Sequence, residues 1–113
     1  MGYYHSTYFA YGIHIPVDGP AWEESERADE ELPKIKAACP DVGHLEAGDY
    51  DRDHFFLVTK CHSVDLGRFE HVTPQTATPE QIADWDQQLI AAAMALGYKD
   101  TSAPGWLVVP DLS

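Results

Sequence analysis

Asparagine is absent from this sequence, and positively charged residues are scarce: 113 residues include 7 lysines and arginines against 19 aspartates and glutamates. The net charge is -12. Because the few cations are dispersed along the chain, they cannot form the patch that neutralises phosphates in nucleic-acid or anionic membrane binding. We therefore expect neither kind of partner. The acidity indicates a highly soluble surface, or else attraction to a basic protein partner or imitation of a polyanion.

Cysteine and long hydrophobic runs are also in short supply. Cys39 and Cys61 are too few for a disulfide scaffold in a chain of this length. No apolar stretch approaches the roughly 20 residues of a membrane-spanning helix, and the first residues lack the basic-then-apolar pattern of a signal peptide. These absences predict a cytoplasmic protein with free thiols.

Apolar residues are plentiful in contrast, at 44% of the chain, with three tryptophans, six tyrosines and four phenylalanines. This is enough material for one core, and the length suits a single domain. The continuous apolar run FFLV at 55–58 indicates a central strand covered on both faces. Alternation and turn residues predict strands over 7–17, 42–47, 54–62 and 106–109. Pro110 is expected to end the last of these strands.

Two helices are predicted between these strands. Asp29 is expected to be the N-cap of the first helix, with residues 18–28 ahead of it as an exposed acidic loop or a frayed helical turn. The second helix has clearer signals, because Thr78 and Gln81 have the spacing of a capping box. Gly97 supplies its expected C-terminal cap.

The elements follow in the order strand, helix, strand, strand, helix, strand. This order predicts an α+β, ferredoxin-like βαββαβ sandwich over residues 1–113, in which a four-stranded antiparallel sheet carries two helices on one face. The first and third strands are central in that topology, and here they are the longest and most apolar. The other face of the sheet is left open to water, a partner or a ligand.

Motifs for catalysis and for metal or cofactor binding are not found in the sequence. It contains no G-x-S-x-G, glycine-rich phosphate loop, C-x-x-C or H-E-x-x-H. The acidic 49–53 hairpin invites a calcium interpretation, but His54 and Lys60 stand where an EF-hand loop needs glycine and glutamate. Cys61 and His62 are neighbours, so on a strand they face opposite sides. We predict no catalytic residue, no metal ligand and no cofactor.

Aromatic residues are expected on the open face of the sheet. Tyr8 and His14 share one face of the first strand, and Phe56, or alternatively Phe55, would lie beside them. Aromatic side chains on this face stack bases in RNA-binding relatives of the fold, but such binding needs flanking Lys and Arg. Self-association or a protein partner fits the composition better. We therefore predict a homodimer and assign Tyr8, His14 and Phe56 to a binding surface.

Two tryptophans lie in segments of different character. Trp106 belongs to the last strand and is expected to anchor the core. Trp22 lies within the acidic 18–28 segment, where burial is harder. Because tryptophan is enriched in binding hot spots, Trp22 is a candidate anchor for a protein partner.

Three stretches of the chain carry a resemblance to known proteins: CPDVGHLEAGDYDRD at 39–53, FFLVT at 55–59 and GWLVVPD at 105–111. They resemble small acidic proteins of actinobacteria and their phages, and the resemblance covers most of the chain. Those proteins have no assigned activity, so the resemblance implies no catalytic residue. It does imply a phage-borne accessory protein that acts on a host or phage partner.

These observations favour a small acidic, non-enzymatic protein that binds or regulates another protein. One alternative is a dimeric ferredoxin-like domain that binds a small molecule or acts as an enzyme, with His14 or His62 as acid–base residue. Another is a structural component of a virion. An enclosed pocket with convergent polar groups would favour the first alternative, whereas an exposed apolar patch would favour the binding protein.

Overall fold

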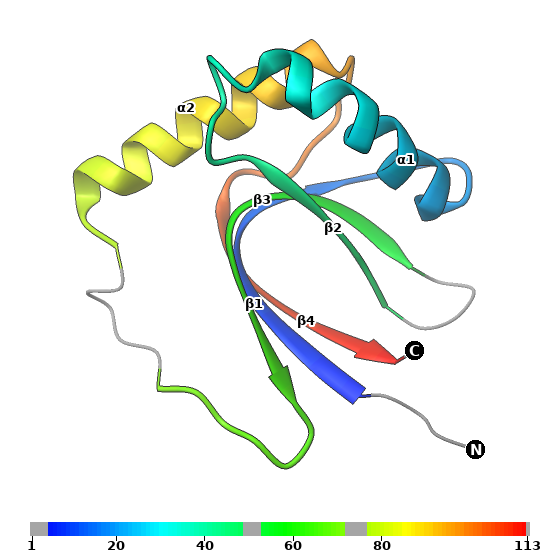
Figure 1. Ribbon diagram of the computed structural model, residues 1–113, viewed down its shortest axis with the longest axis vertical. Coiled ribbons are helices and arrows are strands. Elements are labelled where there is room, and N and C mark those ends of the chain that lie inside the picture. Colours follow the sequence, from blue (N-terminus) through cyan, green and yellow to red (C-terminus); the bar gives the residue numbers. More distant parts are fainter. Residues whose placement is uncertain (1–4, 49–52, 72–76, 113) are drawn as a thin grey trace.

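The computed structural model describes residues 5–48, 53–71 and 77–112 (Figure 1). Four antiparallel strands form one sheet in the order β2-β3-β1-β4, so the first and third strands are central, as expected. This order, with two helices in the connections, confirms the ferredoxin-like α+β arrangement. The elements are β1 (His5–Ile15), α1 (Ala21–Glu31), the 3-10 helix η1 (Leu32–Ile35), β2 (Gly43–Ala47), β3 (His54–Asp65), α2 (Pro79–Ala95) and β4 (Gly105–Leu112).

Both helices pack on the same face of the sheet, over the main core. Phe55 and Leu57 of β3 are fully buried in this core, which settles the face of β3 that the sequence left open. Trp85 and Leu89 cover them from α2, and Ala28 does so from α1. Figure 1 shows α1 and α2 above the sheet.

The sheet curls strongly away from the helices (Figure 1). The pairing of β1 with β3 shifts by one residue between Tyr11 and Gly12, which is a β-bulge, and bulges increase the local bend and twist. The curl brings the two edge strands together. At the end of β2, the Gly48 amide donates a hydrogen bond of 2.9 Å to Asp111 Oδ1 in β4. The face opposite the helices is therefore concave.

This concave face has a small core of its own. Ala10, Phe56 and Val58 are buried there, and Leu45, Ala47 and Val109 complete the cluster. The sequence predicted that this face, with its apolar and aromatic residues, is open. Instead, the curl lets the chain cover most of that apolar surface with its own side chains.

The prediction for the first helix was wrong in its position. The helix begins at Ala21, directly after Pro20, and Asp29 lies in its last turns instead of capping its start. Its buried face contains only Ala21 and Ala28, so no broad apolar stripe marks it in the sequence. Pro33, which lacks an N–H, accompanies the change from α-helix to the short η1.

The second helix agrees with its sequence signals. The Thr78 hydroxyl accepts a hydrogen bond of 3.1 Å from the Gln81 amide at the helix start, and Gly97 adopts a positive φ of 86° after its end. The end of the last strand was predicted wrongly, since β4 continues through Pro110. An edge strand tolerates proline because one side of its backbone needs no partner.

Candidate functional site

An acidic cavity lies at the start of α1, between that helix and the β2–β3 hairpin. It has a volume of about 520 Å³ and is open to solvent. Asp18 and Trp22 line it from the β1–α1 connection and the first helical turn, and Glu46 and Asp53 line it from the hairpin. Three carboxyl groups and one indole therefore share the same cavity. Its lining suits a positively charged group that also carries apolar atoms.

Trp22 is the apolar part of this site. Its side chain remains 53% exposed, although the neighbouring Ala21 is buried against the sheet. The helical turn explains the difference, since consecutive residues on a helix project about 100° apart. A large aromatic side chain left half in water at the edge of a cavity offers contact area to a partner.

Glu46 and Asp53 form the carboxyl pair of the cavity. Glu46 lies on β2 between Leu45 and Ala47, which both turn to the concave face, so alternation directs Glu46 toward α1. Burial raises the pKa of Glu46, and the adjacent Asp53 carboxyl raises it further. A positively charged ligand would relieve this repulsion between the two carboxyl groups.

The outer surface of α1 extends the negative charge beyond the cavity. Seven of the 19 acidic residues lie between residues 18 and 31, where Arg27 is the only basic residue. The Arg27 guanidinium donates to the Leu96 carbonyl at the end of α2 and lies 5.3 Å from the centre of the Tyr98 ring. The outer surface of α1 thus keeps its negative charge, with exposed Glu23, Glu26 and Glu30.

A polar contact fixes the position of α1 over β2. His44 Nε2 lies 2.7 Å from Asp29 Oδ1, and the imidazole is mostly covered whereas the carboxylate is exposed. The His44 ring also stacks near Phe55 of the core, with ring centres 6.1 Å apart. Sequence alternation alone indicates that His44 and Glu46 share one face of β2. That α1 covers this face became clear only from the fold.

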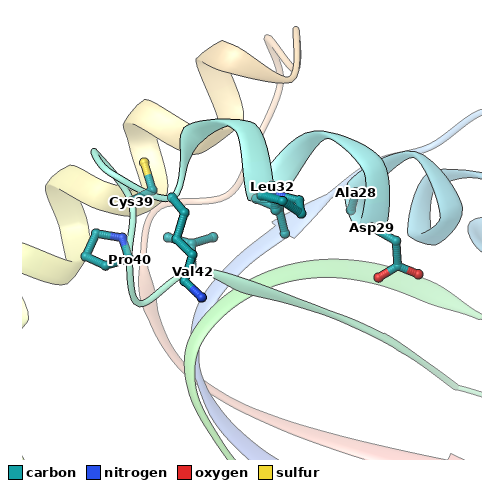
Figure 2. A pocket seen from close by; sticks show the side chains of 8 residues that line it. Ala28, Asp29, Leu32, Cys39, Pro40 and Val42 are labelled. Atoms are coloured by element: carbon teal, nitrogen blue, oxygen red, sulfur yellow. The ribbon is translucent and has the colours of Figure 1, made fainter.

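A second cavity of about 290 Å³ lies below the turn that joins α1 to β2 (Figure 2). Ala28, Leu32 and Val42 provide much of its lining. Figure 2 shows the Cys39 sulfur directed toward α2, where it approaches the Gln88 carbonyl at 3.5 Å. Burial raises the pKa of this thiol, so Cys39 stays protonated and acts as a small core residue, as the sequence predicted.

The aromatic residues that the sequence assigned to the open face lie on the concave face of the sheet. His14 lies beside Phe56, with ring centres 5.3 Å apart, and beside His54 at 5.2 Å. Burial lowers the pKa of His14, and His54 lowers it further. Tyr8 is six residues away on the same strand face, roughly 20 Å along an extended chain. Phe56 itself is buried in the concave core, and Trp22 lies apart on α1.

His62 and Cys61 lie beyond this core, on the longer half of β3. His62 pairs with Phe9 and therefore shares the helix-side face, whereas His14 is on the concave face. His14 and His62, each a separate candidate for an acid–base residue, therefore face opposite sides of the sheet. Burial raises the pKa of the Cys61 thiol, which leaves it a weak nucleophile.

Two further predictions concern metals and tryptophan. Among the described residues, no three His, Cys, Asp or Glu side chains are arranged to hold a metal ion; Asp49 and Asp51 of the acidic hairpin lie outside that part of the chain. Trp106 stacks on Phe9 at 4.9 Å but is 40% exposed, so Trp85 is the buried tryptophan of the core. Within the described segments, no helix is long and apolar enough to cross a membrane.

The comparison with known proteins adds no assignment to this geometry. No protein family, curated protein or solved structure matches the chain. The roles of the residues around α1 therefore follow from their charge, exposure and contacts alone.

Proposed function

We propose that this protein is a non-catalytic, acidic binding module that recognises a basic segment of another protein. The binding surface is the acidic cavity with the outer side of α1. Its carboxylates attract lysine and arginine side chains, and Trp22 contributes the apolar contact.

The observation that carries this proposal is the exposure of Trp22 among carboxyl groups. Half of an indole in water is unfavourable for an isolated domain, because its apolar surface contributes nothing to the core. The same indole can stack on a guanidinium or the aliphatic stem of a lysine. Asp18, Glu46 and Asp53 surround it with the complementary charge.

Two other functions receive less support from the residues. Nucleic-acid binding would require the acidic surface to approach phosphates, and the net charge of -12 opposes it. An enzyme with His14 or His62 as acid–base residue would need a pocket beside that histidine, and neither residue lines either of the two cavities described above. A basic protein segment remains the partner whose chemistry matches the site.

The test uses a short, fluorescently labelled oligo-lysine peptide as the probe. Binding is measured by anisotropy at low and moderate salt. We expect Trp22→Ala to weaken binding about tenfold, equivalent to ~1.4 kcal/mol, because the apolar contact is lost while the net charge is unchanged. Val108→Ala, which truncates another exposed apolar side chain on β4, is the matched control and should leave binding unchanged.

A second pair of variants separates a local site from general attraction. Glu26→Gln on α1 and Glu80→Gln on α2 both neutralise one exposed helical glutamate. We expect Glu26→Gln to weaken binding more than Glu80→Gln. Equal effects of the two substitutions, together with unchanged binding by Trp22→Ala, would show that only net charge matters and would refute the proposal.

A further inference from the structure

The second half of α2 differs in charge from the acidic first helix. Asp86 is the last charged residue before a stretch, 87–98, that contains no aspartate, glutamate, lysine, arginine or histidine. The next charged residue is Lys99. In a chain with a net charge of -12, this half of the helix therefore presents no charged side chain to the solvent.

This stretch is apolar on its outer side as well as on its buried side. Leu89, Ala92, Ala93 and Leu96 are buried against the sheet, as expected for an amphipathic helix. On the outer side, however, Ile90 is 51% and Met94 73% exposed, where surface helices normally carry charged residues. A helix that is apolar on both sides is typically covered on both sides.

The outer side is formed by four residues that we call the α2 stripe: Ile90, Ala91, Met94 and Ala95, all of them exposed. Their spacing of three and four residues places them along one surface of the helix. Ile90 and Met94 have large side chains, and Ala91 and Ala95 have small ones. A second helix can therefore approach closely over the alanines while the large side chains fill the remaining space.

We propose that the α2 stripe binds the α2 stripe of a second copy of this chain, in an antiparallel pair around a twofold axis. In such a contact, each residue meets its symmetry partner's counterpart, so the surface must be complementary to itself. With the axis at the middle of the stripe, Ile90 lies opposite the second copy's Ala95, and Met94 lies opposite its Ala91. Each large side chain then faces a small one.

The charges of the chain favour the same partner and the same face. Two copies that met through α1 would bring their most acidic segments together, whereas the α2 stripe brings no charged residue into the contact. Asp86, the nearest acidic residue, accepts a hydrogen bond from Tyr11 on the sheet side of α2 and so stays out of the contact. An antiparallel pair also opposes the two helix dipoles.

This interface differs from the one that the sequence suggested. The sequence placed self-association on the open face of the sheet, but Phe56 and Val58 there are already buried within the chain. The α2 stripe is on the helical side of the molecule. The dimer does not depend on the basic-partner proposal, because the acidic cavity is built from α1 and the β2–β3 hairpin.

Sedimentation velocity of the full chain, from about 5 to 500 µM, tests this proposal. We expect the mass to rise from 12.6 kDa toward twice that value with increasing concentration. We expect Met94→Glu to raise the dissociation constant of the dimer at least about tenfold, because two carboxylates would enter an apolar contact. Val108→Glu, on β4, adds the same charge at a similarly exposed residue and should leave the dimer intact.

The twofold register is tested by exchanging large and small residues. Ala91→Met alone sets two methionines against each other and should weaken the dimer, whereas combining it with Met94→Ala restores a large residue opposite a small one. Higher salt should strengthen the dimer, since it screens the repulsion between two acidic chains. A single 12.6 kDa species at every concentration, or a dimer that Val108→Glu breaks and Met94→Glu does not, would overturn the proposal.

Discussion

Replacing Gly12 with alanine should be strongly destabilising, because β1 and β3 approach each other closely at this residue. It lies at the β-bulge, where the pairing of β1 with β3 shifts by one residue. A methyl group on Gly12 would lie 2.2 Å from the Leu57 carbonyl oxygen and 2.9 Å from Val58 Cγ1. The first of these neighbours is backbone, so no side-chain rotation can relieve the overlap, and the two central strands must separate.

The expected cost combines two effects. Forcing an extra carbon into a packed core costs about 1–3 kcal/mol. Moving β1 away from β3 at this point also weakens one or two backbone hydrogen bonds, each with a net contribution of about 1 kcal/mol. We therefore expect Gly12→Ala to lower the free energy of unfolding by about 2–5 kcal/mol, a large part of the 5–15 kcal/mol typical of a domain.

The control lies directly across the sheet. Gly105 pairs with Gly12 in the register of β1 and β4, and a methyl group there would meet nothing within 4 Å. Gly105→Ala should therefore be neutral or slightly stabilising, within about 1 kcal/mol of the wild type. Urea unfolding followed by tryptophan fluorescence measures both variants. If Gly12→Ala unfolds within about 1 kcal/mol of the wild type, the approach of β1 and β3 is not close enough to exclude a side chain at residue 12.

Two further predictions concern groups with a shifted pKa. The Tyr11 hydroxyl donates a 2.5 Å hydrogen bond to Asp86, and burial together with Asp86 raises the pKa of Tyr11 to about 12. Tyr11→Phe should cost about 1–2 kcal/mol in urea unfolding at neutral pH. Because the protonated phenol is the stabilised form, this difference should stay constant below pH 10 and shrink as the pH approaches 12; a difference that grows instead would contradict the assignment. Burial and Asp53 raise the pKa of Glu46, so its ionisation destabilises the fold increasingly as the pH rises above 4.5, and fully once the pH exceeds the raised pKa. Glu46→Gln should be more stable than the wild type at pH 7, with the advantage vanishing as the pH falls toward 4.5; a less stable variant at pH 7 would show that Glu46 is not strained there.

Elements with local signals could be predicted from the sequence. The second helix has its cap residues, Thr78 and Gly97, at the right spacing, and these act through bonds within a few residues of one another. The apolar run at 55–58 likewise indicated a central strand, because a strand buried on both faces needs no alternation. From these elements and their order, the ferredoxin-like topology followed.

The first helix and the curl of the sheet depend on information that periodicity does not contain. Burying only Ala21 and Ala28, the first helix shows no apolar stripe, and its acidic residues make the segment look like a loop. The curl depends on the bulge at Gly12, where β1 meets a strand more than forty residues away. A pattern of alternating residues predicts which face a side chain shares, but it does not predict that the face closes on itself.

The candidate site was predictable only in part, for the same reason. The sequence singled out Trp22 as a partner anchor, because a tryptophan among acidic residues has little chance of burial. It did not connect Trp22 with Glu46 and Asp53, since these residues meet only when α1 packs across β2. The acidic residues of α1 were visible in the sequence, but the cavity that they extend is a product of tertiary packing.

Arg27 links the two surfaces proposed for partners. The last turn of α2 has no basic residue of its own, although the carbonyl groups at a helix end favour a nearby cation. Arg27 supplies that cation from α1 by donating to the Leu96 carbonyl. The same contact directs the only positive charge of the 18–31 segment toward the end of α2. One side chain therefore leaves the outer surface of α1 to its acidic residues, and it supplies the end of α2 with a cation that α2 itself lacks.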